Sequence, residues 1–290
     1  MAKKVEKIEK ILFIRLRLMG DIIFTIPSIL MCRKYYPNAE FYYVVEEEFK
    51  DIGSLIPEIK ELIVIPRKMN LMQMLAFRKK MHKIGFDYVV DLHSGPKSAQ
   101  LTRLSGGKIR IGYHSPSRNW AYNRKVSRDY GKVILHSVDN QTRLLKHLYI
   151  PINLEPTPDY PAVTIDESKI SDWVKTLALG KNKDNNLTKE IKIVIHVGAG
   201  NNFRDWGLQN FSTLIQKLLN HFENSTDTKL SIFLIGNSEE EKNKGLQLEK
   251  LFGVTNLTGK LSLFESLYLI SHSNVYVGAD SGPLHLATLT

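Results

Sequence analysis

The sequence predicts an α/β protein made of two parallel-sheet domains that face one another across a crevice. Apolar, β-branched segments alternate with helical segments over residues 11–149, and the alternation starts again at residue 191. Between the two stretches, residues 150–162 contain four prolines, a composition typical of a linker. We therefore expect one domain over residues 1–155 and a second over residues 156–290.

The first predicted strand, residues 11–16, is apolar and partly β-branched, and Gly20 marks the turn after it. Asp21 then begins a helix whose apolar face includes Ile22 and Ile26. The further expected strands are residues 39–45, 59–65, 86–92, 108–113, 191–197, 230–235 and 275–278. The further expected helices are residues 67–84, 98–104, 136–149, 167–179, 208–222, 239–252 and 263–272, with a last helix opening after Asp280. Residues 46–57 are predicted as a short helix or loop, and residues 118–132 as a basic loop.

The composition excludes several classes of protein. A single cysteine, Cys32, excludes a disulfide framework and a cysteine-rich zinc site, and it indicates a reducing, cytoplasmic setting. The amino-terminal apolar run is broken by Arg15 and Arg17 and does not have the pattern of a signal peptide. No run of about 18 apolar residues is present, so no membrane-spanning helix is predicted.

The charge is unevenly distributed. Residues 1–160 carry a net charge of +11 and residues 161–290 a net charge of −1. The basic half predicts an anionic partner, namely a phosphorylated lipid, an acidic sugar or a nucleic acid, although a basic surface can also serve solubility alone. Residues 67–84 combine six basic side chains with four methionines. They are interpreted either as an amphipathic helix packed on the sheet or as a basic helix that touches an anionic membrane.

Three loops share one design, in which a strand is followed by small residues and then by a helix. They are Gly20-Asp21, Gly198-Ala-Gly200 and Asp280-Ser-Gly282. Small residues let backbone N–H groups approach a ligand closely, and a helix start favours an anion, so this design is typical of phosphate binding. Asp21 lies at the carboxyl end of a strand, where ligands of open α/β sheets bind, although an acid at a helix start can also serve the helix alone.

Several nucleotide and metal motifs are absent from the sequence. The third glycine of the dinucleotide-binding pattern G-x-G-x-x-G is replaced by Phe203, which disfavours NAD. No P-loop, Asp-x-Asp or His-Glu-x-x-His sequence occurs. We therefore expect no cofactor and no metal, and we expect Arg204, Ser281 and backbone amides to handle phosphate.

The motifs of the whole chain resemble those of one family. They are Met-Gly20-Asp21…Pro27, Asp91-Leu-His…Ser98, Arg110-Ile-Gly112, His136, His196-Val-Gly-Ala-Gly…Arg204-Asp-Trp206, Gly236…Glu240, and Thr258-Gly-Lys…Gly278-Ala-Asp-Ser-Gly-Pro-Leu-His285. In this order they resemble glycosyltransferase family 9, the ADP-heptose:lipopolysaccharide heptosyltransferases. The resemblance extends over nearly the whole chain, and its most specific parts are the opening Met-Gly-Asp and the closing Asp-Ser-Gly-Pro-Leu-His.

This resemblance implies a GT-B-type fold of two Rossmann-like domains and an inverting, metal-independent transfer. The amino-terminal domain would bind an anionic acceptor, a Kdo-bearing lipid A or a growing inner core, and the carboxyl-terminal domain would bind an ADP-sugar. Asp21 would be the general base, and Arg204 would occupy the usual lysine position of the family. The expected donor-binding residues are Gly198, Gly200, Arg204, Glu240, Asp280, Ser281, Gly282 and His285. The expected acceptor-binding residues are Gly20, His93, Lys97 and Arg118.

Several alternatives stay open at the level of sequence. Glu240 or its neighbour Glu239 would bind the ribose, or either is a helix-start acid, and His285 is either a ligand contact or a brace for its loop. Because family members continue beyond the position of Thr290, the second domain is expected to be incomplete. The rival functions are a GT-B transferase for another nucleotide sugar and a non-catalytic glycolipid-binding relative. The protein is expected to be a cytoplasmic monomer in peripheral contact with the inner membrane, with no nucleic-acid partner.

Overall fold

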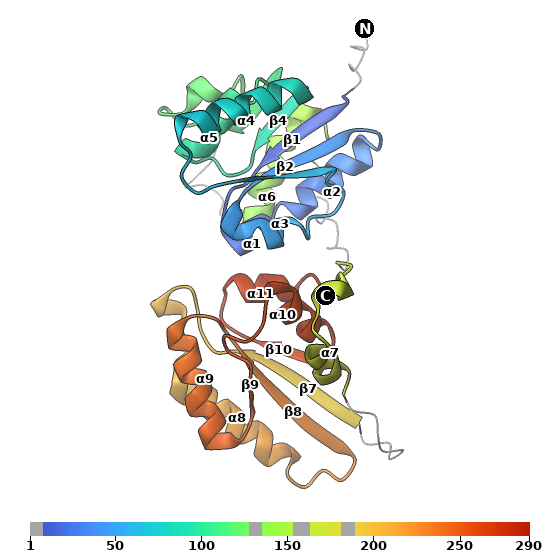
Figure 1. Ribbon diagram of the computed structural model, residues 1–290, viewed down its shortest axis with the longest axis vertical. Helices are drawn as coiled ribbons and strands as arrows, with labels where there is room; N and C mark the ends of the chain where they lie inside the picture. Colours follow the sequence, from blue (N-terminus) through green and yellow to red (C-terminus); the bar gives the residue numbers. More distant parts are fainter. Residues whose placement is uncertain (1–7, 128–134, 153–162, 181–188) are drawn as a thin grey trace. The chain divides into compact units, whose positions relative to one another are not determined.

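The computed structural model describes residues 8–127, 135–152, 163–180 and 189–290. It divides into two compact units, Met1–Tyr160 and Pro161–Thr290 (Figure 1). Each unit contains one parallel sheet. The expected boundary after residue 155 and the division after residue 160 both fall outside the described residues.

The first unit contains a six-stranded sheet in the order β3-β2-β1-β4-β5-β6, with every neighbouring pair parallel. Its strands are β1 (Lys10–Ile14), β2 (Glu40–Glu46), β3 (Glu61–Ile65), β4 (Tyr88–Asp91), β5 (Ile109–Tyr113) and β6 (Arg124–Val126). Its α-helices are α1 (Met19–Ile23), α2 (Ile26–Tyr35), α3 (Lys50–Gly53), α4 (Leu71–Ile84), α5 (Pro96–Leu104) and α6 (Ser137–Thr142). Its 3₁₀ helices are η1 (Glu47–Phe49), η2 (Asn119–Ala121) and η3 (Arg143–Leu148).

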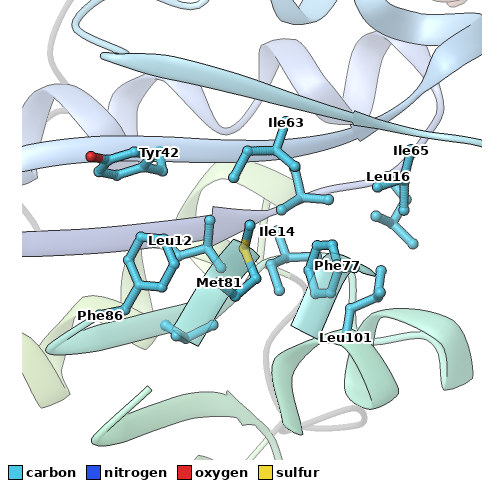
Figure 2. Packing of buried hydrophobic residues seen from close by; sticks show 12 residues of the cluster. Leu12, Ile14, Leu16, Tyr42, Ile63, Ile65, Phe77, Met81, Phe86 and Leu101 are labelled. Carbon is cyan, nitrogen blue, oxygen red and sulfur yellow. The ribbon is translucent and has the colours of Figure 1, made fainter. Parts of the chain in front are cut away.

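Strand β1 is the centre of this sheet. Its residues from Ile11 to Ile14 are fully buried, as expected for a strand covered on both faces. On one face, Leu12 packs in a cluster with Phe77 and Met81 of α4, and Figure 2 shows this packing. On the other face, Arg33 of α2 stacks on the Phe41 ring of β2 at 4.1 Å. Helices therefore cover both faces of the sheet.

The helix expected to begin at Asp21 is broken into two. Helix α1 already begins at Met19 and ends at Ile23, and α2 begins at Ile26. Pro27 explains the break, because its ring has no N–H to donate and clashes with the carbonyl of the residue four positions earlier, Ile23. Asp21 thus lies in the middle of a single short turn that directly follows β1.

The second unit contains a four-stranded parallel sheet in the order β10-β7-β8-β9. Its strands are β7 (Lys189–His196), β8 (Thr228–Ile235), β9 (Thr255–Asn256) and β10 (Val275–Val277). Its helices are α7 (Asp172–Leu179), α8 (Leu208–Phe222), α9 (Glu239–Phe252), α10 (Leu263–Ser271) and α11 (Gly282–Ala287), with 3₁₀ helices η4 (Glu167–Lys169) and η5 (Asn202–Arg204). Buried side chains of β7 and β8 pack against Phe211 and Ile215 of α8 and Leu248 of α9.

Two short strands were not predicted from the sequence. Strand β6 lies inside the stretch interpreted as a basic loop, and β9 has only two residues. Both are too short to show a period in their side chains, and each is paired on one side only. None of the described helices has the length and apolar character that a membrane span requires.

Replacing Leu12 by Ala tests the packing of the first unit. Leu12 is fully buried, so the truncation should cost about 2 to 5 kcal/mol of unfolding free energy through lost burial and the cavity left behind. Leu71, which is 72% exposed, provides the control, and its replacement by Ala should change stability by less than about 0.5 kcal/mol. Urea denaturation of both variants is the measurement. Equal effects of the two changes would contradict the packing described here.

Candidate active site

The order of strands marks one place in each unit where a ligand is expected. In the first unit the chain runs from β1 to β2 and β3 on one side and then returns to β4 on the other. In the second unit it runs from β7 to β8 and β9 and returns to β10. This change of direction creates a switch point in each sheet, the place where open α/β sheets bind their ligands. It lies between the loops after β1 and β4 in the first unit and between the loops after β7 and β10 in the second.

Asp21 lies at the switch point of the first unit and is paired with Arg15. One carboxylate oxygen, Oδ2, forms an ion pair with Arg15 Nη2. The same guanidinium is nearly buried, and its Nη1 donates a hydrogen bond of 2.8 Å to the Leu92 carbonyl oxygen. Arg15 thus joins the loop after β1 to the loop after β4. Among the described residues nothing donates a hydrogen bond to the other oxygen, Oδ1, and the side chain is 27% exposed, so a substrate hydroxyl can reach it.

Strained backbone lies in these same two loops. Leu18, between β1 and α1, has φ 69°, and Ser94, after β4, has φ 60°. A leucine in this region is disfavoured because its Cβ approaches the backbone, at a cost of about 1 to 3 kcal/mol. The strain identifies these loops as ones whose shape is imposed by their surroundings.

The loop after β4 is organised by the buried carboxylate of Asp91. It accepts hydrogen bonds from the His93 N–H at 3.0 Å, the Ser94 N–H at 2.8 Å and the Ser98 hydroxyl at 2.9 Å. The Tyr122 hydroxyl donates a fourth at 2.6 Å. Burial raises the pKa of Asp91, and these four hydrogen bonds oppose the shift. Asp91 thereby holds the turn that carries His93.

The four expected acceptor residues differ in their surroundings. Gly20 adjoins Asp21 in α1, and His93 lies in the loop that Asp91 holds. Arg118 follows β5, the next strand along the sheet, and its guanidinium contacts the neighbouring Ser117 hydroxyl at 3.4 Å. Lys97 is different, because all three donors of its ammonium group are used.

Lys97 joins three segments of the chain. Its Nζ lies 2.8 Å from Glu46 Oε1, 2.8 Å from the Pro66 carbonyl oxygen and 2.9 Å from the Arg67 carbonyl oxygen. An ammonium group has three N–H donors, so this one is saturated by the protein. These contacts tie the end of β2 and the loop after β3 to the first turn of α5.

At the switch point of the second unit, Arg204 and Asp280 are in contact. Arg204 Nη1 donates to the Asp280 carbonyl oxygen at 2.9 Å and lies 3.1 Å from its carboxylate Oδ2. His285 Nε2 lies 3.4 Å from the other carboxylate oxygen of Asp280. The structure therefore brings three of the expected donor residues together, and Arg204 stays about half exposed.

Close packing explains one of the expected glycines. A Cβ at Gly198 would lie 2.2 Å from Glu241 Oε1, so any larger residue would displace the Glu241 side chain. A Cβ at Gly200 would meet nothing within 4 Å, so packing alone does not require glycine there. Ser281 and Gly282 form the turn into α11, and the Ser281 hydroxyl donates to the Ala279 carbonyl oxygen at 3.2 Å.

Glu241 was not among the expected donor-binding residues, yet several contacts hold its carboxylate beside these loops. Its carboxylate accepts hydrogen bonds from the Asn237 and Ser238 N–H groups and lies 3.1 Å from Nε2 of the buried His196. Burial alone would raise the pKa of Glu241, but the hydrogen bonds from His196 and the two amides outweigh it and lower that pKa to about 2. The contact between Glu241 and His196 links α9 to the end of β7, and the Glu241 side chain lies against Gly198.

The two expected ribose-binding acids are exposed instead. Glu240 Oε1 lies 2.9 Å from Lys244 Nζ, which also pairs with Asp205. Glu239 pairs with Lys242 at 2.7 Å. Both acids begin α9, next to the loop after β8, so they stand at the same edge of the sheet as Arg204.

Two signals in the sequence could have identified the missed residues. Arg15 is a charged residue at the end of an apolar run, and a charge in such a place needs a partner. Ser238 and Glu241 form the S-x-x-E pattern of a capping box, in which the acid turns back toward the amides before the helix. That pattern separates Glu241 from its two neighbours. In the described part of the chain, no group of three His, Cys, Asp or Glu side chains is placed to hold a metal ion.

Residues 74–289 match the family model described as glycosyltransferase family 9 (heptosyltransferase). The chain belongs to this family. The expected family and enzyme class are thus confirmed: this family 9 chain is a glycosyltransferase.

Individual heptosyltransferases are similar to this family 9 chain over most of their length. Lipopolysaccharide heptosyltransferase 1 of Campylobacter coli is 26% identical over 288 residues, which cover 96% of this chain and 80% of that protein. Lipopolysaccharide core heptosyltransferase OpsX of Haemophilus influenzae is 23% identical over 284 residues, which cover 95% and 74%. The chain is thus related to enzymes of lipopolysaccharide synthesis along nearly its whole length.

Solved structures show the same fold. A family 9 glycosyltransferase from Veillonella parvula superposes with a TM-score of 0.79 at 18% identity, covering 98% of this chain and 79% of the other. The heptosyltransferase WaaC of E. coli, solved with ADP, gives a TM-score of 0.70 at 22% identity, covering 96% and 83%. The expected fold class, two Rossmann-like parallel-sheet units of GT-B type, is confirmed.

Replacing Glu241 by Gln tests the buried contact beneath Gly198. The pKa of Glu241 is lower in the folded than in the unfolded protein, so its contribution to stability is present above about pH 4.5 and is lost as the pH falls toward about 2. At pH 7 the variant should lose about 1 to 2 kcal/mol of unfolding free energy, since part of the carboxylate still meets water.

Denaturant unfolding at neutral and acid pH is the measurement. The difference between wild type and Glu241→Gln should shrink as the pH is lowered below about 4.5. Glu239→Gln is the matched control, because Glu239 lies in the same helix turn and is 85% exposed. A loss for Glu241→Gln that equals that of the control, or that does not change with pH, would contradict the assignment.

Proposed function

We propose that this protein transfers heptose from ADP-heptose to the inner core of lipopolysaccharide, with inversion at the anomeric carbon and without a metal ion. Membership of family 9 and the names of the relatives support the class of donor and acceptor. The presence of ADP in the solved structure of E. coli WaaC supports the nucleotide. The net charge of +11 on residues 1–160 suits a phosphorylated, acidic acceptor.

The observation that carries this proposal is the carboxylate of Asp21 at the switch point of the first unit. Arg15 holds one of its oxygens and leaves the other open to a ligand. In the proposed reaction an acceptor hydroxyl attacks the anomeric carbon while Asp21 removes its proton. The bond from the anomeric carbon to the phosphate oxygen breaks, and ADP leaves with the electron pair. Arg15 keeps the carboxylate oriented through Nη2, while the Leu92 carbonyl oxygen holds its Nη1.

The proposed donor site lies at the switch point of the second unit. The departing diphosphate gains negative charge, and Arg204 is the exposed guanidinium beside Asp280 that would neutralise it. In the structure the Asp280 carboxylate pairs with this guanidinium. When the donor binds, Arg204 would exchange that carboxylate for the diphosphate. Backbone N–H groups of Ser281 and Gly282 would add hydrogen bonds, and Glu240 or Glu239 would bind the ribose.

The proposed acceptor site uses the other loops at the carboxyl edge of the first sheet. Gly20 and His93 flank Asp21 on the loops that Arg15 joins, and Arg118 supplies a cation from the loop after β5. We leave Lys97 out of the proposed contacts, because its donors are already used within the protein. An acceptor anchored in lipid would bring the enzyme, as a monomer, to the cytoplasmic face of the inner membrane.

Replacing Asp21 by Asn tests the proposed base. Asn keeps the size of the side chain but cannot take up the proton, so kcat for heptose transfer should fall by about 10²- to 10⁴-fold. Binding of ADP should not change, because the substitution lies in the other unit. The measurement is ADP release in the presence of a Kdo-bearing acceptor, together with calorimetric titration of ADP.

Asp51→Asn is the matched control. Asp51 is an exposed acid in α3 of the same unit, and its replacement should leave kcat unchanged. Transfer by Asp21→Asn at the wild-type rate would show that Asp21 is not the base. Absence of any transfer by the wild type, with ADP-heptose and with each acceptor offered, would refute the proposed function as a whole.

A further inference from the structure

Helix α4 has two faces that differ in kind. Its inner face presents Phe77 and Met81 to the core beneath the sheet (Figure 2). Its outer face carries large aliphatic side chains in water. Leu71 is 72% exposed, Met72 79% and Leu75 55%. Three large apolar side chains within five residues form a patch that the fold of this unit does not use.

Basic side chains continue the same outer face toward the end of the helix. With 3.6 residues per turn, Arg78 and Lys79 follow Leu71 and Leu75 on one side of α4, and Lys83 follows Lys79. All three basic residues are exposed, as are Arg67 and Lys68 just before the helix. Residues 67–84 contain no acid. The ion pair recorded within this stretch is that of Lys80 with Glu61, at 2.6 Å.

The position of this surface is firmly held. Asn70 caps α4, its side chain accepting from the Gln73 N–H and its own N–H donating to Gln73, both at 2.9 Å. Lys97 fixes the preceding loop through the Pro66 and Arg67 carbonyl oxygens. Because α4 follows β3, its first turn stands at the carboxyl edge of the sheet, the edge that also carries Asp21.

We propose that this outer face of α4, formed by Leu71, Met72, Leu75, Arg78, Lys79 and Lys83, docks on an anionic lipid bilayer. The aliphatic residues of the first two turns enter the interfacial region, and the cations behind them meet lipid phosphates. The inference deepens the proposed function and rests on it for a lipid-anchored acceptor. Docking by this face sets the carboxyl edge of the first sheet near the membrane surface from which that acceptor projects.

The basic and apolar side chains on the outer face of α4 argue against a second copy of the chain or a nucleic acid as the binding partner. A second copy of the chain on a two-fold axis would place the same basic side chains against one another, which is repulsive. A nucleic acid would meet the cations but would leave the aliphatic side chains without a role. An anionic bilayer complements both parts of the surface.

Sedimentation with vesicles tests the proposal. The protein should bind vesicles that contain phosphatidylglycerol and phosphatidylcholine, and it should bind pure phosphatidylcholine far more weakly. Replacing Leu71, Met72 and Leu75 together by Gln keeps helix propensity and should weaken binding by at least about tenfold. The variant Arg78→Glu/Lys79→Glu should weaken binding by a similar factor and reduce its dependence on salt.

The matched control is Leu246→Gln/Leu251→Gln on α9, where the two leucines are 49% and 64% exposed. Its vesicle binding should equal that of the wild type, and all variants should keep the melting temperature of the wild type. Absence of wild-type binding to anionic vesicles, or wild-type binding by both α4 variants, would overturn the proposal. Vesicle binding without heptose transfer would refute the proposed function but would still support the docking surface on α4.

Discussion

Where a strand is buried on both faces its enclosed stretch is apolar, and the next polar groups stand beyond that stretch; this constraint organises both units. Residues 11–14 of β1 and residues 193–195 of β7 are apolar and nearly closed to water. The next polar side chains along the sequence are Arg15, just past the end of β1, and His196, at the end of β7. These are also the strands at which the chain changes direction across each sheet. Packing and topology thus place Arg15 and His196 at the carboxyl edges of their sheets.

Each of these buried polar groups is stabilised by a partner on a neighbouring segment. Arg15 reaches Asp21 in α1 and the carbonyl of Leu92 after β4, whereas His196 reaches Glu241 in α9. A buried charge without such a partner would cost several kcal/mol. The contacts that pair Arg15 and His196 therefore also hold the loops in place. In the first unit they orient a carboxylate, and in the second they support the turn that contains Gly198.

Much of the fold could be predicted because short, local patterns in the sequence determine its helices and strands. The apolar run of β1 can be recognised from the sequence alone, and Gly20 and Asp21 stand out because they interrupt an apolar run at its end. What could not be predicted depends on segments distant in the sequence. Lys97 looks like a free cation for an acceptor until Glu46 and two carbonyls from the loop after β3 occupy its donors. Strand β6 is visible only through its pairing with β5.

The proposed function requires that the second unit binds ADP through Arg204. Calorimetric titration of the wild type and of Arg204→Ala with ADP, UDP and GDP is the most direct measurement. The second unit should bind ADP more tightly than the other two nucleotides, and Arg204→Ala should weaken ADP binding by about 10- to 100-fold, the usual effect of losing a charged hydrogen bond. Preference for UDP or GDP, or an affinity of Arg204→Ala for ADP equal to that of the wild type, would contradict the proposed donor site.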